Sequence, residues 1–321
     1  MPIALDSLRT RLNDGLLAFP ATAFTPELAL DEERYRMLFR QLAGFGPAAM
    51  FSAAGAGEFF SLTLREHEAV VRASVEESSG IPVFAGVGGG IGAALDLSRQ
   101  SERCGADGLL LCPPYLVGGE QQGLSAYVET VCRSVGIGVV VYNRDQLQLL
   151  PDTLARLSER CPNLIGLKDG VGDLETLIAS RLRLGERLAF INGMPTAEIS
   201  AVAYAAIGIR SYSSAVLNFA PRTALRFYEA FRQRDNVTVD RMLADLYLPV
   251  GNLRRRGRGY AVSIVKAGLK VMGRSAGPVR PPLVDLKPDE EELLRSILSV
   301  HAAPDLLESP DSACEVTRHH G

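Results

Sequence analysis

The chain has 321 residues, of which 47% are hydrophobic, and a formal net charge of −3. This length and apolar content allow a large buried core, and a single α/β barrel domain routinely reaches this size. The weak negative charge excludes the broad cationic surface that holds nucleic acid or an anionic membrane. Five cysteines without a Cys-x-x-Cys pair favour reduced thiols over a disulfide framework or a zinc site.

Eight short apolar runs recur along the chain, and each is followed by polar or glycine residues and then by an amphipathic segment. The runs are continuously apolar, as is typical of parallel strands buried on both faces. Eight such units predict a closed (β/α)8 barrel. The predicted strands are Leu16–Phe19, Ala48–Phe51, Pro82–Ala85, Gly108–Leu111, Gly138–Tyr142, Leu164–Lys168, Leu188–Asn192 and Gly208–Ser211.

Capping residues mark the ends of the helices expected between these strands. Asp31 precedes one amphipathic segment, and Thr63 with Glu66 forms a capping box before the next. Gly44 and Gly80 stand where these two helices are expected to stop. The alternation of strand and capped helix therefore supports the barrel.

A doubly wound open sheet is the competing architecture, because Gly88-x-Gly90-x-x-Ala93 matches a loose dinucleotide fingerprint. The context is poor, since no acidic residue ends the next predicted strand, which runs into Cys112 and two prolines. We interpret these glycines as a tight turn between a strand and a helix.

We expect the barrel to occupy residues 1–232 and a C-terminal helical extension of the same domain to occupy residues 233–303. Helical segments of the extension are predicted around Val237–Leu248, Ala261–Met272 and Asp289–His301. Residues 304–321 show little periodicity and are predicted to form a disordered tail.

Chemically capable residues end two neighbouring strands. The fifth strand ends at Tyr142 and the sixth at Lys168, and adjacent strands lie about 4.8 Å apart, so the two side chains can share a pocket. An apolar pocket favours the neutral lysine amine that attacks a keto group, and a phenol can relay protons. The alternative is that Lys168 extends into water while Tyr142 packs on the rim.

A glycine-rich turn, Gly55-Ala56-Gly57-Glu58, follows the second strand. Successive backbone N–H groups in such a turn can bind a carboxylate, especially near the start of a helix. The alternative is an ordinary loop that leads into a capped helix.

Metal schemes have little support in the sequence. It contains four histidines, no His-Glu-x-x-His motif and no cluster of ligands at strand ends. The only basic run, Arg254-Arg255-Arg256 with Arg258, is most simply a solvated helix end, although an oligomer contact or a gate for an anionic substrate is also possible.

The order and spacing of four motifs resemble the dihydrodipicolinate synthase/N-acetylneuraminate lyase family over roughly residues 10–300. The motifs are Gly55-Ala56-Gly57-Glu58, Pro113-Pro114-Tyr115, Tyr142-Asn143 and Gly166-Leu167-Lys168-Asp169. The resemblance implies a class I enzyme that joins a lysine to a 2-keto acid as an imine and needs no other cofactor.

The resemblance also implies a role for each matching residue. Lys168 would form the imine, Tyr142 would relay protons, and Gly55 with Ala56 would bind the 1-carboxylate. Tyr115 would reach into the site of a neighbouring subunit in a homotetramer or homodimer. The turn lacks the hydroxyl residues of the usual Gly-Thr-Thr-Gly-Glu motif. Backbone N–H groups would therefore have to bind the carboxylate, and the turn supplies no threonine hydroxyl for a proton relay.

Within that family, the chain is most similar to the branch called 5-dehydro-4-deoxyglucarate dehydratase. The similarity lies in residues 58–63, 142–145, 193–198 and 211–214, and in the absence of the Pro-Ser-Arg-Thr-type stretch that follows the tyrosine in the synthase branch. It implies loss of water and carbon dioxide from a 2-keto sugar acid with two carboxylates. Arg144 would bind the distal carboxylate, and Ser211 and Ser213 would bind hydroxyls.

Two other functions stay open at this point. The chain could be an aldolase or synthase of the same family that condenses pyruvate with an aldehyde, or a sugar-acid-binding protein without catalysis. Intact Lys168 and Tyr142 argue against the binding protein. The sequence shows no signal peptide and no apolar stretch long enough to span a bilayer. We therefore expect a cytoplasmic protein without a membrane or nucleic-acid partner.

Overall fold

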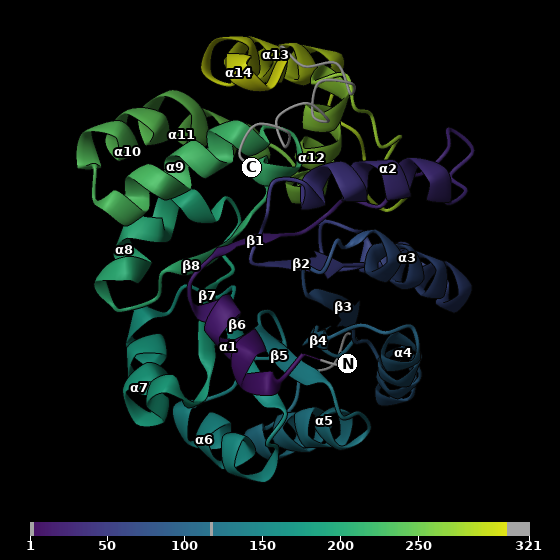
Figure 1. Ribbon diagram of the computed structural model, residues 1–321, viewed down its shortest axis with the longest axis vertical. Helices are drawn as coiled ribbons and strands as arrows, with labels where there is room; N and C mark the ends of the chain where they lie inside the picture. Colours follow the sequence, from purple (N-terminus) through teal and green to yellow (C-terminus); the bar gives the residue numbers. More distant parts are fainter. Residues whose placement is uncertain (1–2, 116–117, 307–321) are drawn as a thin grey trace, which may run out of the picture.

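The computed structural model of the protein describes residues 3–115 and 118–306. Each strand pairs in parallel with the next one along the chain, and β8 pairs with β1, which closes the barrel and confirms the predicted fold (Figure 1). The strands are β1 (Leu16–Ala18), β2 (Ala49–Ser52), β3 (Val83–Val87), β4 (Gly108–Leu111), β5 (Gly138–Asn143), β6 (Leu164–Asp169), β7 (Ala189–Asn192) and β8 (Ser211–Ser214).

Helices separate the strands and surround the barrel (Figure 1). In the described part of the chain, none of them is both long and apolar enough to cross a membrane. The helices of the barrel are α1 (Leu5–Asn13), α2 (Glu32–Ala43), α3 (Leu64–Glu77), α4 (Ile91–Arg103), α5 (Gln121–Arg133), α6 (Pro151–Arg160), α7 (Leu174–Leu184), α8 (Ala201–Ala206) and α9 (Pro221–Gln233), with short turns η1 (Phe59–Ser61), η2 (Gly185–Arg187), η3 (Ala197–Ser200) and η4 (Val216–Asn218).

The strands separate an inner apolar layer from an outer one. Along β1, Leu17 belongs to the inner cluster, whereas Leu16 and Ala18 belong to the outer cluster that packs against the helices. Phenylalanine rings from three consecutive strand regions stack inside the barrel, with centroids 4.6 Å apart for Phe19 and Phe51 and 4.8 Å apart for Phe51 and Phe84. Side chains thus fill the barrel, as is usual for this fold.

The register between β5 and β6 shifts by one residue partway along the two strands. Val139 pairs with Leu164, but Val140 pairs with Gly166, so that Ile165 is an extra residue. Such a bulge changes the side to which the following side chains point. Beyond it, Lys168 pairs with Tyr142, which belongs to the inner cluster. The bulge therefore turns the lysine to the inside of the barrel.

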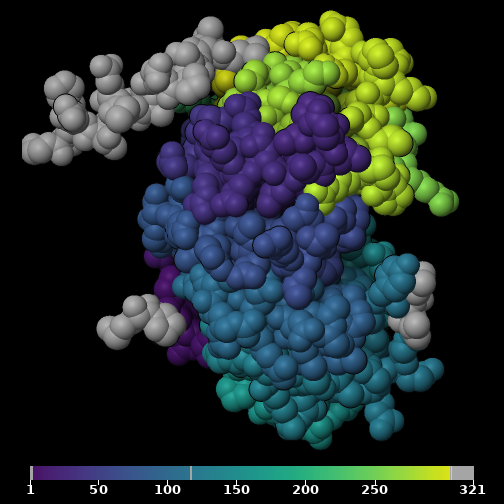
Figure 2. All heavy atoms as spheres, turned by 90° about the vertical axis from the view of Figure 1, so that its right-hand side faces the viewer, coloured from purple at the N-terminus to yellow at the C-terminus, as the bar shows by residue number. Residues whose placement is uncertain are grey.

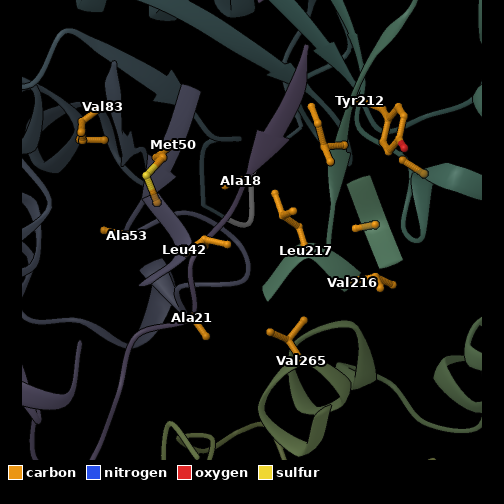
Figure 3. Packing of buried hydrophobic residues seen from close by; sticks show 14 of the residues in the cluster. Ala18, Ala21, Leu42, Met50, Ala53, Val83, Tyr212, Val216, Leu217 and Val265 are labelled. Carbon is orange, nitrogen blue, oxygen red and sulfur yellow. The ribbon is translucent and has the colours of Figure 1, made fainter. Parts of the chain in front are cut away.

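The C-terminal helices pack at one side of the barrel, beside α2 and α9 (Figure 1), and Val265 lies close to Leu217 and Ala21 (Figure 3). Figure 2 shows these helices, coloured green to yellow, against the purple N-terminal residues. The side chain of Arg34 contributes to this contact, because its Nε donates a hydrogen bond of 2.7 Å to the carbonyl oxygen of Ser275. The elements are α10 (Asn236–Met242), η5 (Leu243–Tyr247), α11 (Leu248–Arg254), α12 (Tyr260–Val271), α13 (Pro288–His301) and α14 (Ala303–Leu306).

Most predicted strands differ from the observed ones by one or two residues at an end, and two predictions differ by three residues. The eighth strand begins at Ser211, the residue at which the predicted strand ends. Its Ser-Tyr-Ser-Ser sequence carries no apolar run, and the preceding Gly208 has a positive φ of 87° and closes the turn after α8. At the C-terminus, residues 304–306 of the predicted tail belong to α14, and residues 307–321 lie outside the described residues.

Candidate active site

Lys168 and Tyr142 lie side by side inside the barrel at the carboxyl ends of β6 and β5. They are 4% and 9% exposed, so both functional groups are shielded from bulk water. The Lys168 Nζ lies 3.6 Å from the centroid of the Tyr142 ring and 5.0 Å from that of Phe19. The structure thus brings together the two residues for which the sequence predicts imine chemistry.

The carbonyl oxygen of Gly193, just after β7, links the two groups. It accepts hydrogen bonds of 3.3 Å from the Lys168 Nζ and 3.2 Å from the Tyr142 hydroxyl. A Cβ atom at position 193 would lie 2.6 Å from the Lys168 Nζ, so the close approach requires glycine. Gly170 is needed for the same reason, because its Cβ would lie 2.7 Å from the Tyr142 ring.

Burial favours the reactive form of the lysine. It lowers the pKa of Lys168 and outweighs the opposing effect of the nearby Tyr142 oxygen, while the positive charge of Arg144 lowers that pKa further. A lowered pKa increases the fraction of neutral amine, which is the nucleophile in imine formation. The site therefore has the electrostatic character that a Schiff-base lysine requires.

The surroundings of Tyr142 lower the pKa of its phenol, which favours proton transfer. Burial acts to raise its pKa, but the positive charges of Lys168 and Arg144 outweigh burial and leave the pKa below its ordinary value. The Nη1 of Arg144 donates a hydrogen bond of 3.1 Å to the Tyr142 hydroxyl, and its Nε lies 3.3 Å from an Asp145 carboxylate oxygen. Arg144 thus contacts Tyr142 directly, which the sequence did not indicate.

The turn after β2 lies beside the same inner cluster. Ala54 belongs to the cluster that includes Phe19 and Tyr142, and Ala56 packs against it. Within the described residues, the backbone N–H groups of Gly55 and Ala56 donate no hydrogen bond. Free N–H groups beside the cluster that holds Phe19 and Tyr142 suit the carboxylate of a 2-keto acid.

The other expected substrate ligands have different surroundings. Ser211 lies at the opposite end of β8 from the lysine, where its hydroxyl donates a hydrogen bond of 3.0 Å to the Gly15 carbonyl oxygen. This placement differs from the expected one because the strand begins at Ser211. Ser213 is half-buried and donates to the Asn192 carbonyl oxygen at 3.5 Å. Tyr115 is 73% exposed in the single chain and is not part of the cluster around Lys168.

Gly193 and Cys112 lie near the lysine, but no role was predicted for either of them from the sequence, whereas Arg254 belongs to the basic run noted there. Burial raises the pKa of the Cys112 thiol to about 12 against the charges of Lys168 and Arg144, so the thiol stays protonated. The Nε of Arg254 is buried without an acceptor among the described residues. Burial and then the charges of Arg255 and Arg144 lower the pKa of Arg254. Over the described ranges, no group of three or more histidine, cysteine or acidic residues is placed to hold a metal ion.

A buried acid lies behind the site. Glu198, in η3, is fully buried and accepts a hydrogen bond of 2.6 Å from the Ser214 hydroxyl at the end of β8. Burial raises the pKa of Glu198 to about 7, although the Ser214 hydrogen bond acts to lower it. The hydroxyls of Tyr212 and Tyr247 are also buried without a partner among the described residues. Among the described residues, no cation contributes to the shift of this pKa, and burial favours the neutral carboxyl group.

We expect this acid to make stability depend on pH. Because the folded state binds the proton of Glu198 more tightly than the unfolded chain does, its contribution is complete below the unfolded pKa and is lost as the pH rises through about 7. Glu198→Gln should remove this contribution, worth roughly 3 kcal/mol. Chemical denaturation of both proteins between pH 4.5 and pH 8 measures their free energies of unfolding. As the pH rises, the difference should shift in favour of the variant, because only the wild type loses stability. A difference that does not change with pH would contradict the assignment.

A closed eight-stranded barrel with a buried lysine and tyrosine at its carboxyl edge defines a class of barrel proteins equipped for imine chemistry. Residues 12–301 match the model of the Dihydrodipicolinate synthetase family. The dihydrodipicolinate synthase of Bacillus clausii superimposes with a TM-score of 0.84 at 25% identity, over 91% of this chain and 99% of that one.

Curated relatives are closer in sequence. A protein of Azotobacter vinelandii named "Probable 5-dehydro-4-deoxyglucarate dehydratase" is 50% identical over 91% of this chain and 96% of its own length. A protein of the same name from Methylobacterium radiotolerans is 51% identical over 89% of this chain and 95% of its own length. This chain belongs to the dihydrodipicolinate synthetase family, as its motifs had indicated.

Proposed function

We propose that this chain is a Schiff-base lyase with the activity of a 5-dehydro-4-deoxyglucarate dehydratase, which releases water, carbon dioxide and 2,5-dioxopentanoate. The observation that carries the proposal is the buried contact between the Lys168 amine and Tyr142, with the Nζ 3.6 Å from the ring centroid. The named relatives, at about 50% identity over most of the chain, support this substrate.

The reaction begins when the neutral Lys168 amine attacks the keto carbon of the substrate. Tyr142 transfers protons as the carbinolamine forms and loses water to give the iminium. Removal of a proton from the adjacent methylene gives an enamine, which expels the hydroxyl on the next carbon as water. The conjugated iminium then accepts the electron pair of the bond to the distal carboxylate, which leaves as carbon dioxide. Proton return and hydrolysis of the imine release the dioxo acid and regenerate Lys168.

The two ends of the substrate need different binding groups. The free N–H groups of Gly55 and Ala56 would bind the carboxylate next to the keto carbon. Arg144 would bind the distal carboxylate, because its guanidinium lies 3.1 Å from the Tyr142 hydroxyl and so faces the reacting centre. The charge of Arg254 acts on the same region. Ser213 would bind a hydroxyl of the substrate, and Ser211, at the far end of β8, would act only through the strand. The exposed Tyr115 would be covered in a homodimer or homotetramer.

The experiment that tests this function follows both products. With 5-dehydro-4-deoxyglucarate and no added metal or nucleotide, we expect carbon dioxide and the dioxo acid in equal amounts. Chelators should have no effect because the iminium is the electron acceptor. Coupled assays for carbon dioxide and for the aldehyde measure the ratio. Pyruvate and an aldehyde fragment in place of carbon dioxide would make the protein an aldolase.

Arg144→Ala serves as the control for the orientation of the substrate. We expect the variant to have a much higher KM for the dicarboxylate. The pyruvate concentration that gives half-maximal imine trapping should rise much less, since pyruvate has no distal carboxylate. Equal changes for both ligands would remove Arg144 from the distal subsite without affecting the assignment of the lysine.

A further inference from the structure

A buried ion pair joins the C-terminal helix α12 to the turn after β2. The Lys266 Nζ lies 2.7 Å from the Glu58 Oε1, and the two side chains are 1% and 0% exposed. The other carboxylate oxygen of Glu58 accepts a hydrogen bond of 2.8 Å from the backbone N–H of Arg280. Neither side chain has a role in the reaction proposed above.

The surroundings of Lys266 fix its position. Its Nζ donates a hydrogen bond of 2.6 Å to the Pro278 carbonyl oxygen and lies 4.1 Å from the centroid of the Phe24 ring. Burying two charges costs free energy, and well-packed apolar residues often replace a buried pair without loss of stability. Stability alone therefore gives little reason for a charged pair at this place, and its contacts suggest a more specific role.

The pair acts on a strained part of the backbone. Glu58 has a φ of 54°, a left-handed conformation that costs free energy for a residue other than glycine. Its backbone N–H donates a hydrogen bond of 3.1 Å to the Gly55 carbonyl oxygen, which closes the turn. The Thr22 hydroxyl donates a hydrogen bond of 2.7 Å to the Gly57 carbonyl oxygen. The conformation of Glu58 therefore determines how the turn is closed.

The turn has no side chain that could bind a carboxylate, because residues 54–57 are Ala-Gly-Ala-Gly. Only its backbone N–H groups are available, and their directions depend on the shape of the turn. A Cβ atom at Gly86 would lie 2.2 Å from the Ala53 carbonyl oxygen, so the turn rests directly on β3 from one side. Glu58 with Lys266 supports it from the other end.

We propose that Lys266 is a positioning residue which, through Glu58, holds the Gly55–Ala56 turn in the shape that binds the substrate carboxylate next to the keto group. The inference rests on the proposed function, because the ligand is the carboxylate of that 2-keto acid. It gives the C-terminal helix a part in substrate affinity, although α12 contributes no reacting group.

The test is Lys266→Met, which keeps an unbranched side chain, one atom shorter, and removes the charge. We expect KM for the keto acid to rise by about 100-fold, because a small misplacement of binding groups can have an effect of this size. The kcat should change by less than about threefold, because the carboxylate is bound in the ground state and in the transition state alike. The pyruvate concentration for half-maximal borohydride trapping should rise by a similar factor, whereas trapping with acetone, which has no carboxylate, should not change.

Two control variants separate positioning from general stability. Lys270→Met removes an exposed pair on the same helix, where the Nζ lies 2.7 Å from a Glu291 oxygen. Tyr260→Phe removes a buried hydrogen bond of 2.7 Å to Glu290 at the start of that helix. We expect both variants to keep the wild-type KM, even where Tyr260→Phe lowers the melting temperature.

A second form of the experiment covers the case in which Lys266→Met fails to fold. Lys266→Met with Glu58→Gln removes both buried charges and keeps an acceptor for the Arg280 N–H, so it should fold and still bind pyruvate weakly. Wild-type affinity for pyruvate in a folded variant, or an equal loss of trapping with acetone, would overturn the proposal. Wild-type protein that traps pyruvate but releases no carbon dioxide would instead contradict the proposed function.

Discussion

Lys168→Met is expected to reduce turnover by at least about 10⁴-fold, since no other group can replace the covalent nucleophile. The methionine keeps an unbranched apolar side chain against Phe19 and Tyr142, so the packing of the inner cluster should be preserved. Because burial disfavours the lysine charge, the variant should be at least as stable as the wild type. Steady-state kinetics and thermal unfolding of the two proteins measure both effects.

Borohydride reduction in the presence of pyruvate provides the matching control. The sequence contains only four lysines, Lys168, Lys266, Lys270 and Lys287, which makes the modified peptide easy to assign by mass spectrometry. We expect the adduct on Lys168 alone and none in the methionine variant. An adduct on another lysine, or activity retained by the variant, would show that Lys168 is not the imine-forming residue.

Tyr142→Phe should lower kcat by about 10²–10⁴-fold, the usual contribution of a proton-transfer group. The phenylalanine ring can keep its place beside the Lys168 amine, but the hydrogen bonds of the hydroxyl to Gly193 and Arg144 are lost. KM should change little, because the hydroxyl acts on proton transfer and not on ground-state binding. Rates measured over a range of substrate concentrations separate the two parameters.

Tyr228→Phe is a suitable comparison for that variant. The Tyr228 hydroxyl lies 3.5 Å from an Asp14 oxygen. Asp14 precedes the first residue of β1, so this contact lies at the opposite end of the barrel from the lysine. Its removal should leave kcat unchanged. If Tyr142→Phe behaves in the same way, Tyr142 has a packing role only.

The sequence predicted the strands well where burial dictates their composition. β4 and β5 are continuously apolar up to their last residues because helices cover one face and the inner cluster covers the other. The bounds of β8 could not be found in this way, since Ser211 and Ser214 are fully buried but form hydrogen bonds with residues far along the chain. Those partners are set by the tertiary structure and leave no local pattern.

In the candidate site, too, some contacts follow from the local sequence and others only from the tertiary structure. The proximity of Tyr142 and Lys168 was predictable because parallel strands end at the same edge of the barrel. The contact with Gly193 depends on the path of the backbone after β7, where the carbonyl group of a residue without a side chain approaches the amine. Lys266 was not predictable either, since its partner Glu58 is distant in the sequence and in a loop.

The extra residue at Ile165 shows that the presence of the lysine does not by itself set the side to which it points. If Ile165 paired with Val140 in a regular register, every later residue of β6 would shift by one and Lys168 would point to the helices. Instead Gly166 pairs with Val140, where a Cβ atom at position 166 would lie 3.2 Å from a Val140 methyl group. When activity is assigned to other sequences of this kind, the register of the sixth strand is therefore as informative as the identity of its last residues.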